Sequence, residues 1–487
     1  MSILEIIIAL PLIAALAVWA GAPARAISIA ATSFNLGATL LLCFQYAGSG
    51  GAGLKFTHAV PILENPAMSF AVGADGTSLI LALLTTLVML AAIWQIEDRP
   101  DVFYISSLLI GGGALGAFLT TDVFFIYAFH ELALIPTFLM IALHGRAEPA
   151  QRKAVAWKAT IYLGAGSLVL LAGLAWAVLE FSGGAKLTFD IEALRSQAKL
   201  TPLPVDKQAQ IYFVLLLGFG TLVSLFPFHS WAAPAYATAP TPVAMLHSGV
   251  LKKFGLYGLL RIALPLLPQG AQVEWVQNAL LLMLLGNILV MGLVTIYANR
   301  LDETLANSSV MHMGYIFLAL AAGSDIALKG AVLLMFAHGV SIALLFGLCG
   351  RMRNQLGTLE YSKLGGLASH APAFTVLFAF GAFASIGLPG LTNFAGELMI
   401  FAGSFASFHG TLTHLHWTVI FALWGVVMSA VYMLRAYRGI FHGSANTGLF
   451  MTDPALSQRV PFILLATTLL VTGCCPWLLL NLMKSAL

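Results

Sequence analysis

The sequence predicts an all-α membrane protein of about fourteen transmembrane helices. Hydrophobic residues occupy 60% of its 487 positions and charged residues only 9%, whereas a soluble domain carries about 25% charged residues because its surface faces water. Apolar runs of roughly 18–25 residues recur along the chain, and each is long enough to cross a hydrocarbon core of about 30 Å. The runs do not alternate between polar and apolar residues, which excludes strands as the main element.

Fourteen apolar segments are expected to cross the membrane, separated by loops that carry the glycine, proline and polar residues typical of turns. Their expected bounds are residues 2–20, 27–46, 78–95, 102–120, 122–143, 155–179, 210–231, 240–265, 274–298, 304–322, 328–350, 372–403, 416–438 and 460–483. The first segment lacks a basic leading region, so we expect a retained span and not a cleaved signal. The long polar loop near 182–208 is expected to hold a short amphipathic segment.

Basic residues in the short loops indicate the orientation. The opposite short loops carry only Lys55, Arg261 and Lys329, whereas the loops on one side carry Arg25, Arg146, Arg152, Lys153, Arg351, Arg353, Lys363, Arg438 and Arg459. The positive-inside rule places this larger set on the cytoplasmic side. We therefore expect both chain termini on the non-cytoplasmic side, and the lack of a transit peptide favours a bacterial plasma membrane.

Charge and cysteine content exclude several classes of partner and cofactor. The net charge of +3 is spread over loops without a basic cluster, so we expect no nucleic-acid partner. The four cysteines lie in apolar segments without metal-ligand spacing, and we expect all of them to be small buried hydrophobic residues; they are Cys43, Cys349, Cys474 and Cys475. No iron–sulfur, haem or dinucleotide-binding signature is present, so we expect no metal or cofactor in this chain.

Two of the expected spans contain a proline near their middle. Pro227 lies in the sequence LFPFH of the seventh span and Pro389 in IGLPG of the twelfth. Proline removes a backbone hydrogen bond, and a helix opened in this way persists in a membrane only where protein or a wet cavity satisfies its backbone. Either site alone could be an ordinary kink. Two breaks at corresponding places in two halves indicate a transporter built from inverted repeats.

Charged side chains inside apolar spans are costly and usually functional. They are Glu131, Lys158, Lys252, Lys253 and Glu397, accompanied by His130, His247, His312 and His338. Burial disfavours charged forms, so a carboxylic acid and a lysine can both exchange protons near neutral pH, and histidine can pass a proton between them. The set therefore predicts a proton relay.

Structural roles are the alternative for each of these groups. Glu131 and Glu397 could form ion pairs, His312 and His338 could be satisfied packing residues, and the Lys158 side chain could extend to a lipid headgroup. Successive helix positions are about 100° apart, so we expect one lysine of the Lys252–Lys253 pair to face the interior and the other a partner or a wet cleft.

Motifs along nearly the whole chain carry a resemblance to a known family. They are residues 73–78 (GADGTS), Glu131 with 134–136 (LIP), 226–231 (FPFHSW), 239–243 (APTPV), 249–261, 308–314 (SSVMHMG), 337–339 (AHG), 387–390 (GLPG), 393–394 (NF) and 396–397 (GE). Together they resemble the antiporter-like membrane subunits of respiratory complex I (NADH-quinone oxidoreductase), specifically the subunit M type.

The resemblance implies fourteen helices with breaks in the seventh and twelfth. It implies N-terminal helices at 1–101, two inverted five-helix repeats at 102–265 and 274–438, and a C-terminal helix at 439–487. It also implies proton translocation coupled to quinone reduction in other subunits. Those partner membrane subunits would include a neighbouring antiporter-like subunit, and the partners, not this chain, would hold NADH, FMN, iron–sulfur clusters and quinone.

Individual roles are also implied by the resemblance. Glu131 is similar to the carboxylate of the fifth helix, Lys253 to the central lysine of the eighth, and Glu397 to the terminal carboxylate of the twelfth. His312 and His338 resemble the linking histidines.

Two positions depart from the family pattern. The family has a lysine five residues before the seventh-helix proline, where it pairs with the fifth-helix carboxylate, but this chain has Leu222. We therefore expect Glu131 to be largely protonated at neutral pH or paired with Lys158 or Lys252. Before the tenth span the family has a basic pair, whereas residues 300–303 read RLDE, so a contact with a neighbouring subunit could differ.

Three functions remain open at the level of sequence. The first is a proton-translocating subunit of a complex I-like NADH-quinone oxidoreductase. The second is the same fold in a cation/proton antiporter, a membrane-bound hydrogenase or an inorganic-carbon uptake complex. The third is a scaffold subunit that moves no ions. Lysine and histidine suit H⁺ better than Na⁺, which prefers a cage of oxygen ligands.

Overall fold

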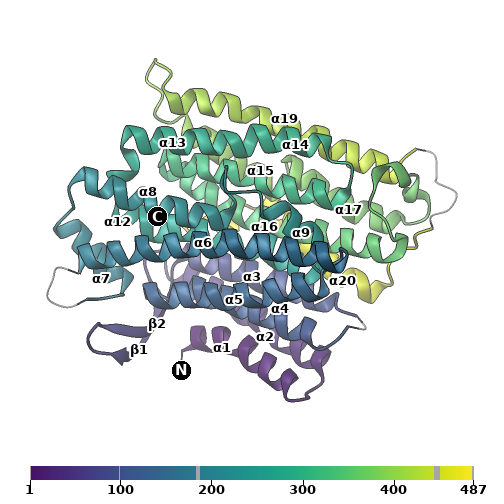
Figure 1. The fold of residues 1–487 in the computed structure, drawn as a ribbon, viewed down its shortest axis with the longest axis horizontal. Helices are drawn as coiled ribbons and strands as arrows, with labels where there is room; N and C mark the ends of the chain where they lie inside the picture. Colours follow the sequence, from purple (N-terminus) through teal and green to yellow (C-terminus); the bar gives the residue numbers. More distant parts are fainter. Residues whose placement is uncertain (1, 98, 183–186, 444–449, 485–487) are drawn as a thin grey trace.

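Long helices run side by side in one bundle, with their axes close to horizontal in Figure 1. The computed structural model describes residues 2–97, 99–182, 187–443 and 450–484. Ten helices of this described chain are long and apolar enough to cross a membrane. The prediction of an all-α membrane protein is confirmed. The total of fourteen crossings and the two inverted repeats stay predictions.

Every predicted span overlaps one helix or a series of shorter ones, but the seventh, 210–231, ends before the short helix at 232–238. The unbroken helices are α1 Ile3–Trp19, α2 Ala24–Gly48, α3 Gly76–Trp94, α4 Val102–Leu119, α5 Val123–His144, α6 Pro149–Phe181, α15 Leu301–Ala322, α16 Asp325–Leu356 and α19 His414–Phe441. The interrupted series are α8 Val205–Val223 with α9 Ala232–Thr238; α10 Thr241–Leu246, α11 Lys253–Gly258 and α12 Leu264–Leu266; α13 Glu274–Leu285 with α14 Met291–Tyr297; α17 Pro372–Ile386 with α18 Thr392–Ser404; and α20 Leu456–Cys474 with α21 Trp477–Leu480.

Three wider π-helical turns lie within two of these series, the one from α10 to α12 and the one from α13 to α14. They are η1 His247–Leu251, η2 Leu259–Ala263 and η4 Gly286–Val290. Such turns widen the helix locally and occur frequently at functional sites. Two of them flank the six residues of α11, which begins at Lys253.

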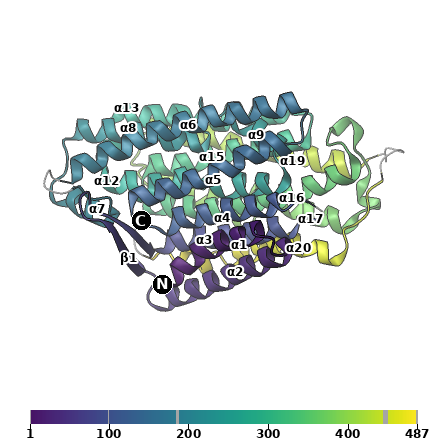
Figure 2. The same cartoon turned by 60° about the horizontal axis from the view of Figure 1, so that its bottom comes forward.

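A β-hairpin and a short helix lie together at one end of the bundle (Figures 1 and 2). The antiparallel strands β1 Lys55–Leu63 and β2 Met68–Ala74 were not predicted. Helix α7 Ile191–Leu200 confirms the predicted amphipathic segment, and Asp190 caps it by accepting from the Ala193 amide at 2.7 Å. A bridge between Ala67 and Thr188 joins the two features.

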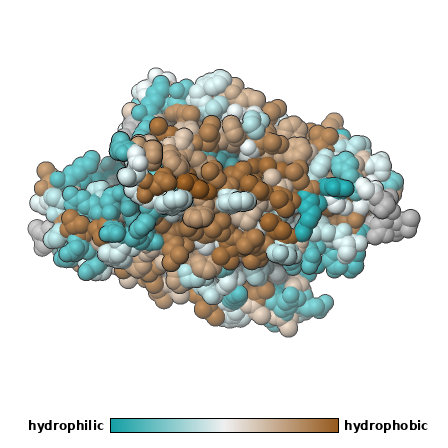
Figure 3. Space-filling view, turned by 90° about the horizontal axis from the view of Figure 1, so that it is seen from above, coloured by the Kyte–Doolittle hydropathy of each residue, from teal (hydrophilic) through white to brown (hydrophobic). Residues whose placement is uncertain are grey.

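Helices α3, α15 and α16 form the centre of the bundle. The most apolar windows of α3 and α16 are fully buried, whereas those of α2 and α20 are only one-third buried. Seen from above Figure 1, apolar side chains form a band between two hydrophilic ends (Figure 3), as expected where lipid or neighbouring subunits cover the surface. The prediction of four buried cysteines is wrong for Cys474, which is exposed, and for the partly exposed Cys475, because α20 lies at the edge of the bundle.

Close backbone contact at the centre requires glycine. A Cβ atom built at Gly339 on α16 would lie 2.7 Å from Gly249 O on η1. This is closer than a Cβ atom approaches a non-bonded oxygen in proteins. Small residues allow membrane helices to approach in this way. The contact brings the segment before Lys253 against the helix that carries His338.

The first break follows α8, as predicted around Pro227. Ser224 takes a left-handed conformation with φ of 73°, and the helix resumes at Ala232. Asn287 satisfies the opened backbone from η4: its Oδ1 accepts from the Phe226 amide at 2.7 Å, and its Nδ2 donates to Ser224 O at 2.9 Å and Val310 O at 3.0 Å. One buried amide therefore compensates for the bonds that the break removes.

The second break separates α17 from α18 around Pro389, as predicted. Gly387 and Gly390 take φ values of 81° and 91°, which glycine adopts without steric cost. A side chain at Gly387 would also overlap the Glu397 carboxylate. The glycines thus turn the chain and leave room for an acid.

Replacing Asn287 by alanine should destabilise the protein. The change leaves the Phe226 amide and the Ser224 and Val310 carbonyls without this partner, and each unsatisfied buried group costs about 1–3 kcal/mol. Unfolding of the purified protein in detergent should therefore begin at lower temperature. The control is Asn278→Ala on α13, because the hydrogen bond of the Asn278 side chain goes to the exposed His414 ring, at 3.0 Å. Equal melting of both variants would contradict the role of Asn287.

Candidate functional site

A lysine and a histidine meet in the buried centre of the bundle. Lys253 Nζ lies 2.9 Å from His338 Nδ1 and donates to Ser248 O at 2.8 Å. The two residues are 0% and 3% exposed. Because a protonated lysine has no acceptor atom, His338 Nδ1 accepts when Lys253 is charged, and the histidine proton then sits on Nε2. A proton can pass between the two groups along this contact.

The next group is His312 on α15. Its ring centre lies 5.6 Å from that of His338, and its Nε2 lies 4.0 Å from Oε1 of Glu397 on α18. A side-chain rotation or one bridging water spans each of these separations. Lys253, His338, His312 and Glu397 therefore form a line, here called the central relay, that runs from α11 through α16 and α15 to α18.

Both ring nitrogens of His312 face carbonyl oxygens. Nδ1 lies 2.8 Å from Ser308 O and Nε2 lies 2.9 Å from Ser385 O, at the end of α17. A carbonyl only accepts, and a neutral imidazole carries one N–H, so only the doubly protonated ring satisfies both. The site is thus built to hold a second proton beside an acid.

Glu397 is poised to exchange that proton. It is 5% exposed, and its Oε1 has no hydrogen-bond partner among the described residues. His338 Nε2 is unpartnered in the same described set. Unsatisfied buried polar atoms are rare in structures and commonly mark catalytic groups or bound water, so both ends of the His338–His312–Glu397 segment retain free capacity.

Lys252 and Lys253 diverge although both point inward. Lys252 Nζ donates to Ser309 O at 3.1 Å and lies 5.5 Å from the centre of the Tyr236 ring, and Lys252 is 1% exposed. The expectation that one lysine faces a partner or a wet cleft is therefore wrong. The preceding π-helical turn and the two neighbouring helices α15 and α16 provide separate buried sites for adjacent residues.

Two further histidines lie against aromatic rings. His130 stacks on Phe254 with ring centres 4.0 Å apart. The ring centre of His247 lies 5.5 Å from that of Trp231 and 5.4 Å from that of Tyr236. Neither of these histidines is among the four residues of the central relay.

Glu131 lies at the edge of the bundle. Its carboxylate accepts from Ser167 on α6 and lies 3.5 Å from His130 Nδ1, and its side chain is 37% exposed. The expected pairing with Lys158 or Lys252 is absent among the described contacts, because Lys252 is held by Ser309. Lys158 is exposed on α6 and Leu222 is buried on α8. Glu131 therefore faces out of this chain at its membrane-spanning surface.

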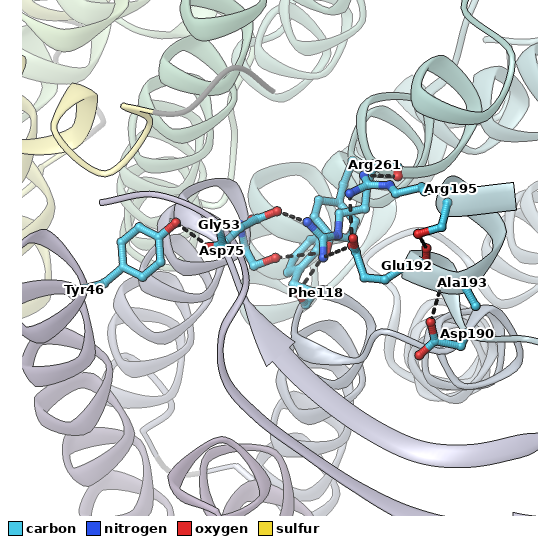
Figure 4. A network of polar contacts seen from close by, with 12 residues as sticks. Tyr46, Gly53, Asp75, Phe118, Asp190, Glu192, Ala193, Arg195 and Arg261 are labelled. Atoms are coloured by element: carbon cyan, nitrogen blue, oxygen red, sulfur yellow. Dashed lines mark hydrogen bonds and ion pairs between the residues drawn. The ribbon is translucent and has the colours of Figure 1, made fainter. Parts of the chain in front are cut away.

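An ion-pair network closes the end of the bundle that holds α7 (Figure 4). Arg261 on η2 pairs with Asp75 and lies 3.5 Å from Glu192, and Arg195 pairs with Glu192 at 3.1 Å. Asp75 also caps α3 by accepting from the Ser78 amide at 2.8 Å. The network fixes the end of the segment that begins at Lys253, and it lines a cavity of about 150 Å³.

The unusual acidic residues at 302–303 lie at the opposite end. Asp302 is 3% exposed; it accepts from Arg300 at 3.1 and 3.2 Å and pairs with Arg353 from α16. Asp302, which departs from the family pattern, therefore links residues within this chain and does not face a neighbouring subunit.

Several supporting residues were missed by sequence reasoning. Ser248 and Ser309 accept hydrogen bonds from Lys253 and Lys252, and Ser167 donates one to Glu131. Asn287 satisfies the backbone at the first break. Ser248 and Ser167 carry no distinctive signal, because Ser is common in membrane helices. Ser309 lies in the motif 308–314, but no role was predicted for it. An amide in the apolar span 274–298 was a usable signal for Asn287.

Comparison with known proteins gives concordant matches. Residues 120–422 match the family described as NADH:quinone oxidoreductase/Mrp antiporter, TM. NAD(P)H-quinone oxidoreductase chain 4 2 of Microcystis aeruginosa is 32% identical over 418 residues, covering 84% of this chain and 73% of that protein. NAD(P)H-quinone oxidoreductase chain 4 1 of a Synechococcus strain is 31% identical over 459 residues, covering 92% and 84%.

Solved structures agree with these relatives. A chain of respiratory complex I from Thermus thermophilus with bound NADH superposes with a TM-score of 0.88 at 28% identity, covering 98% of this chain and 97% of that one. A chain of the Mrp complex from Dietzia sp. shares the fold, with a TM-score of 0.84 at 21% identity and coverage of 98% and 95%. The chain therefore belongs to the NADH:quinone oxidoreductase/Mrp antiporter transmembrane family.

Proposed function

We propose that this chain is a proton-translocating membrane subunit of an NADH-quinone oxidoreductase complex. The observation that carries the proposal is the central relay, in which four titratable side chains from α11, α16, α15 and α18 follow one another through the buried centre. Lys253 and His338 exchange a proton directly, and His312 holds it beside Glu397. The relatives named as NAD(P)H-quinone oxidoreductase chain 4 support this choice of complex.

The exposed side of Glu131 supports a partner subunit. A carboxylate at a lipid-facing surface inside the membrane is costly unless a polar or charged group covers it. Exposed apolar residues surround it on α5, including Ile135 and Leu139. A neighbouring antiporter-like subunit seated here would cover both. In this proposal the redox cofactors, namely NADH, FMN, iron–sulfur clusters and quinone, belong to other subunits.

The arginine-rich loop ends support an orientation. Arg146, Arg351 and Arg353 lie at the end of the bundle opposite α7, and the positive-inside rule places that end in the cytoplasm. Both termini would then lie on the non-cytoplasmic side of a bacterial plasma membrane.

A subunit of a cation/proton antiporter is the second candidate. The shared fold with the Mrp complex chain and the leucine at position 222 favour it. Purification of the native complex separates the two: NADH-driven quinone reduction by the purified assembly supports the first function, and sodium-dependent proton exchange without that activity supports the second. If the assembly pumps protons and turns over at wild-type rates after the relay is removed, this chain is instead a scaffold subunit.

Lys253→Ala should abolish most proton movement. One positioned acid–base group contributes about 10²–10⁴-fold to a proton-transfer step, so pumping by vesicles that hold the assembled complex should fall by at least about tenfold, with redox turnover unchanged or slowed. The control is Lys207→Ala, because Lys207 pairs with Glu180 at the bundle end. Pumping and turnover both equal to wild type in the assembled Lys253 variant would contradict the proposal.

Glu397→Gln removes the acid and keeps the shape of the side chain. We expect proton pumping to fall by a similar factor, because the amide cannot take the proton that His312 releases. Glu397→Asp should restore part of the rate by restoring an acid. The exposed Glu274 on α13 provides the matched control, Glu274→Gln; loss of pumping in that control as well would remove the support.

A further inference from the structure

A hollow of about 350 Å³ opens at the arginine-rich end of the bundle, away from the central relay. The ends of α3 and α16 and the starts of α10 and α20 surround it. Its polar lining includes Glu97, His144, Arg146, Thr241, Arg351 and Gln458. Nothing in the relay uses these side chains.

The two arginines inside this hollow are held by neutral groups. Arg146 Nη2 donates to Thr241 Oγ1, and Arg351 Nη2 donates to Gln458 Oε1. Arg351 Nε is buried without a hydrogen-bond partner in the described chain. Among the described residues, which leave out 98, neither arginine forms an ion pair with a carboxylate.

The acidic residue that lines the hollow is already engaged. Glu97 accepts from Gln458 Nε2 at 3.1 and 3.2 Å, so an amide lies between Glu97 and Arg351. At the opposite end of the bundle, the two arginines of the smaller cavity, Arg195 and Arg261, both pair with carboxylates. Of these two cavities, the larger one presents guanidinium groups that form no ion pair with a carboxylate of the described residues.

Arg146 stays charged in this setting. Burial and the nearby Arg353 lower the pKa of Arg146 to about 10, which still leaves it protonated at neutral pH. Arg353 itself forms an ion pair with Asp302. A third cation, the exposed Arg99, lines the hollow with its guanidinium 5.8 Å from the Phe103 ring centre.

We propose that this hollow binds a phosphate-type oxyanion, carried by an anionic phospholipid headgroup or by soluble phosphate. The planar fork of a guanidinium matches the oxygens of a phosphate and binds them with charge-assisted hydrogen bonds. A volume of about 350 Å³ admits such a group with its substituents. Trp94 also lines the hollow, and its Nε1 donates to Ser457 O at 3.0 Å; tryptophan is typical of the headgroup level of a membrane.

The test uses the complete complex in lipid nanodiscs made of phosphatidylcholine. Phosphatidylglycerol or inorganic phosphate is added, and the bound amount is measured by native mass spectrometry and by ³¹P NMR. The double variant Arg146→Gln with Arg351→Gln should raise the apparent Kd of the bound species by at least about tenfold, because two charge-assisted contacts are lost. The matched control, Lys153→Gln with Arg438→Gln, removes the same charge from exposed positions at the same end and should bind like wild type.

The two probes distinguish the sources. Retention of phosphatidylglycerol that inorganic phosphate does not displace assigns the site to a lipid headgroup, whereas binding of inorganic phosphate at equal or higher affinity assigns it to a soluble anion. Equal binding of both probes by wild type and the double variant, or equal loss in the control, overturns the proposal. If the double variant does not assemble, Arg351→Lys keeps the charge but not the fork and should weaken binding; unchanged binding there is equally contrary.

Discussion

The bilayer gives backbone polar groups no partner, and this constraint governs both interruptions in the bundle. At the first, Asn287 satisfies the backbone that opens after α8, by contacts of 2.7 Å to the Phe226 amide and 2.9 Å to the Ser224 carbonyl. At the second, glycines turn the chain, and His312 Nε2 approaches the carbonyl of Ser385 at 2.9 Å. The second solution is the chemically consequential one, because it uses a titratable ring to satisfy backbone and thereby places that ring beside Glu397.

The central relay depends equally on how closely its helices approach. Gly249 and Gly339 allow η1 and α16 to touch through their backbones, and this contact sets the 2.9 Å separation of Lys253 and His338. The ion-pair network of Asp75, Arg261 and Glu192 anchors the far end of the same segment. Close helix packing, the ion-pair network and the helix breaks therefore all help to position the four residues of the central relay.

Composition and apolar run length were sufficient to predict the helices, because the bilayer imposes length and hydropathy on every span. The breaks were predictable from Pro227 and Pro389, and Lys253, His312, His338 and Glu397 were identified as charges in apolar surroundings and by family resemblance. Their order in space was not predictable, since it depends on which helices become neighbours. For the same reason it was not predictable that Lys252 would bind Ser309, that Glu131 would face outward, or that α20 would leave Cys474 exposed. The hairpin was missed because its strands are too short to cross a membrane, and one of them, β1, is mostly exposed.

The most direct test of the relay removes its middle and leaves both ends in place. His338→Phe keeps a ring of similar size against His312 but provides no nitrogen for Lys253. The measurement is the number of protons moved per NADH oxidised, in vesicles that hold the assembled complex. The central relay predicts a lower ratio or a parallel loss of pumping and turnover, whereas an unchanged ratio at an unchanged rate would show that protons do not pass from Lys253 to Glu397 along this line.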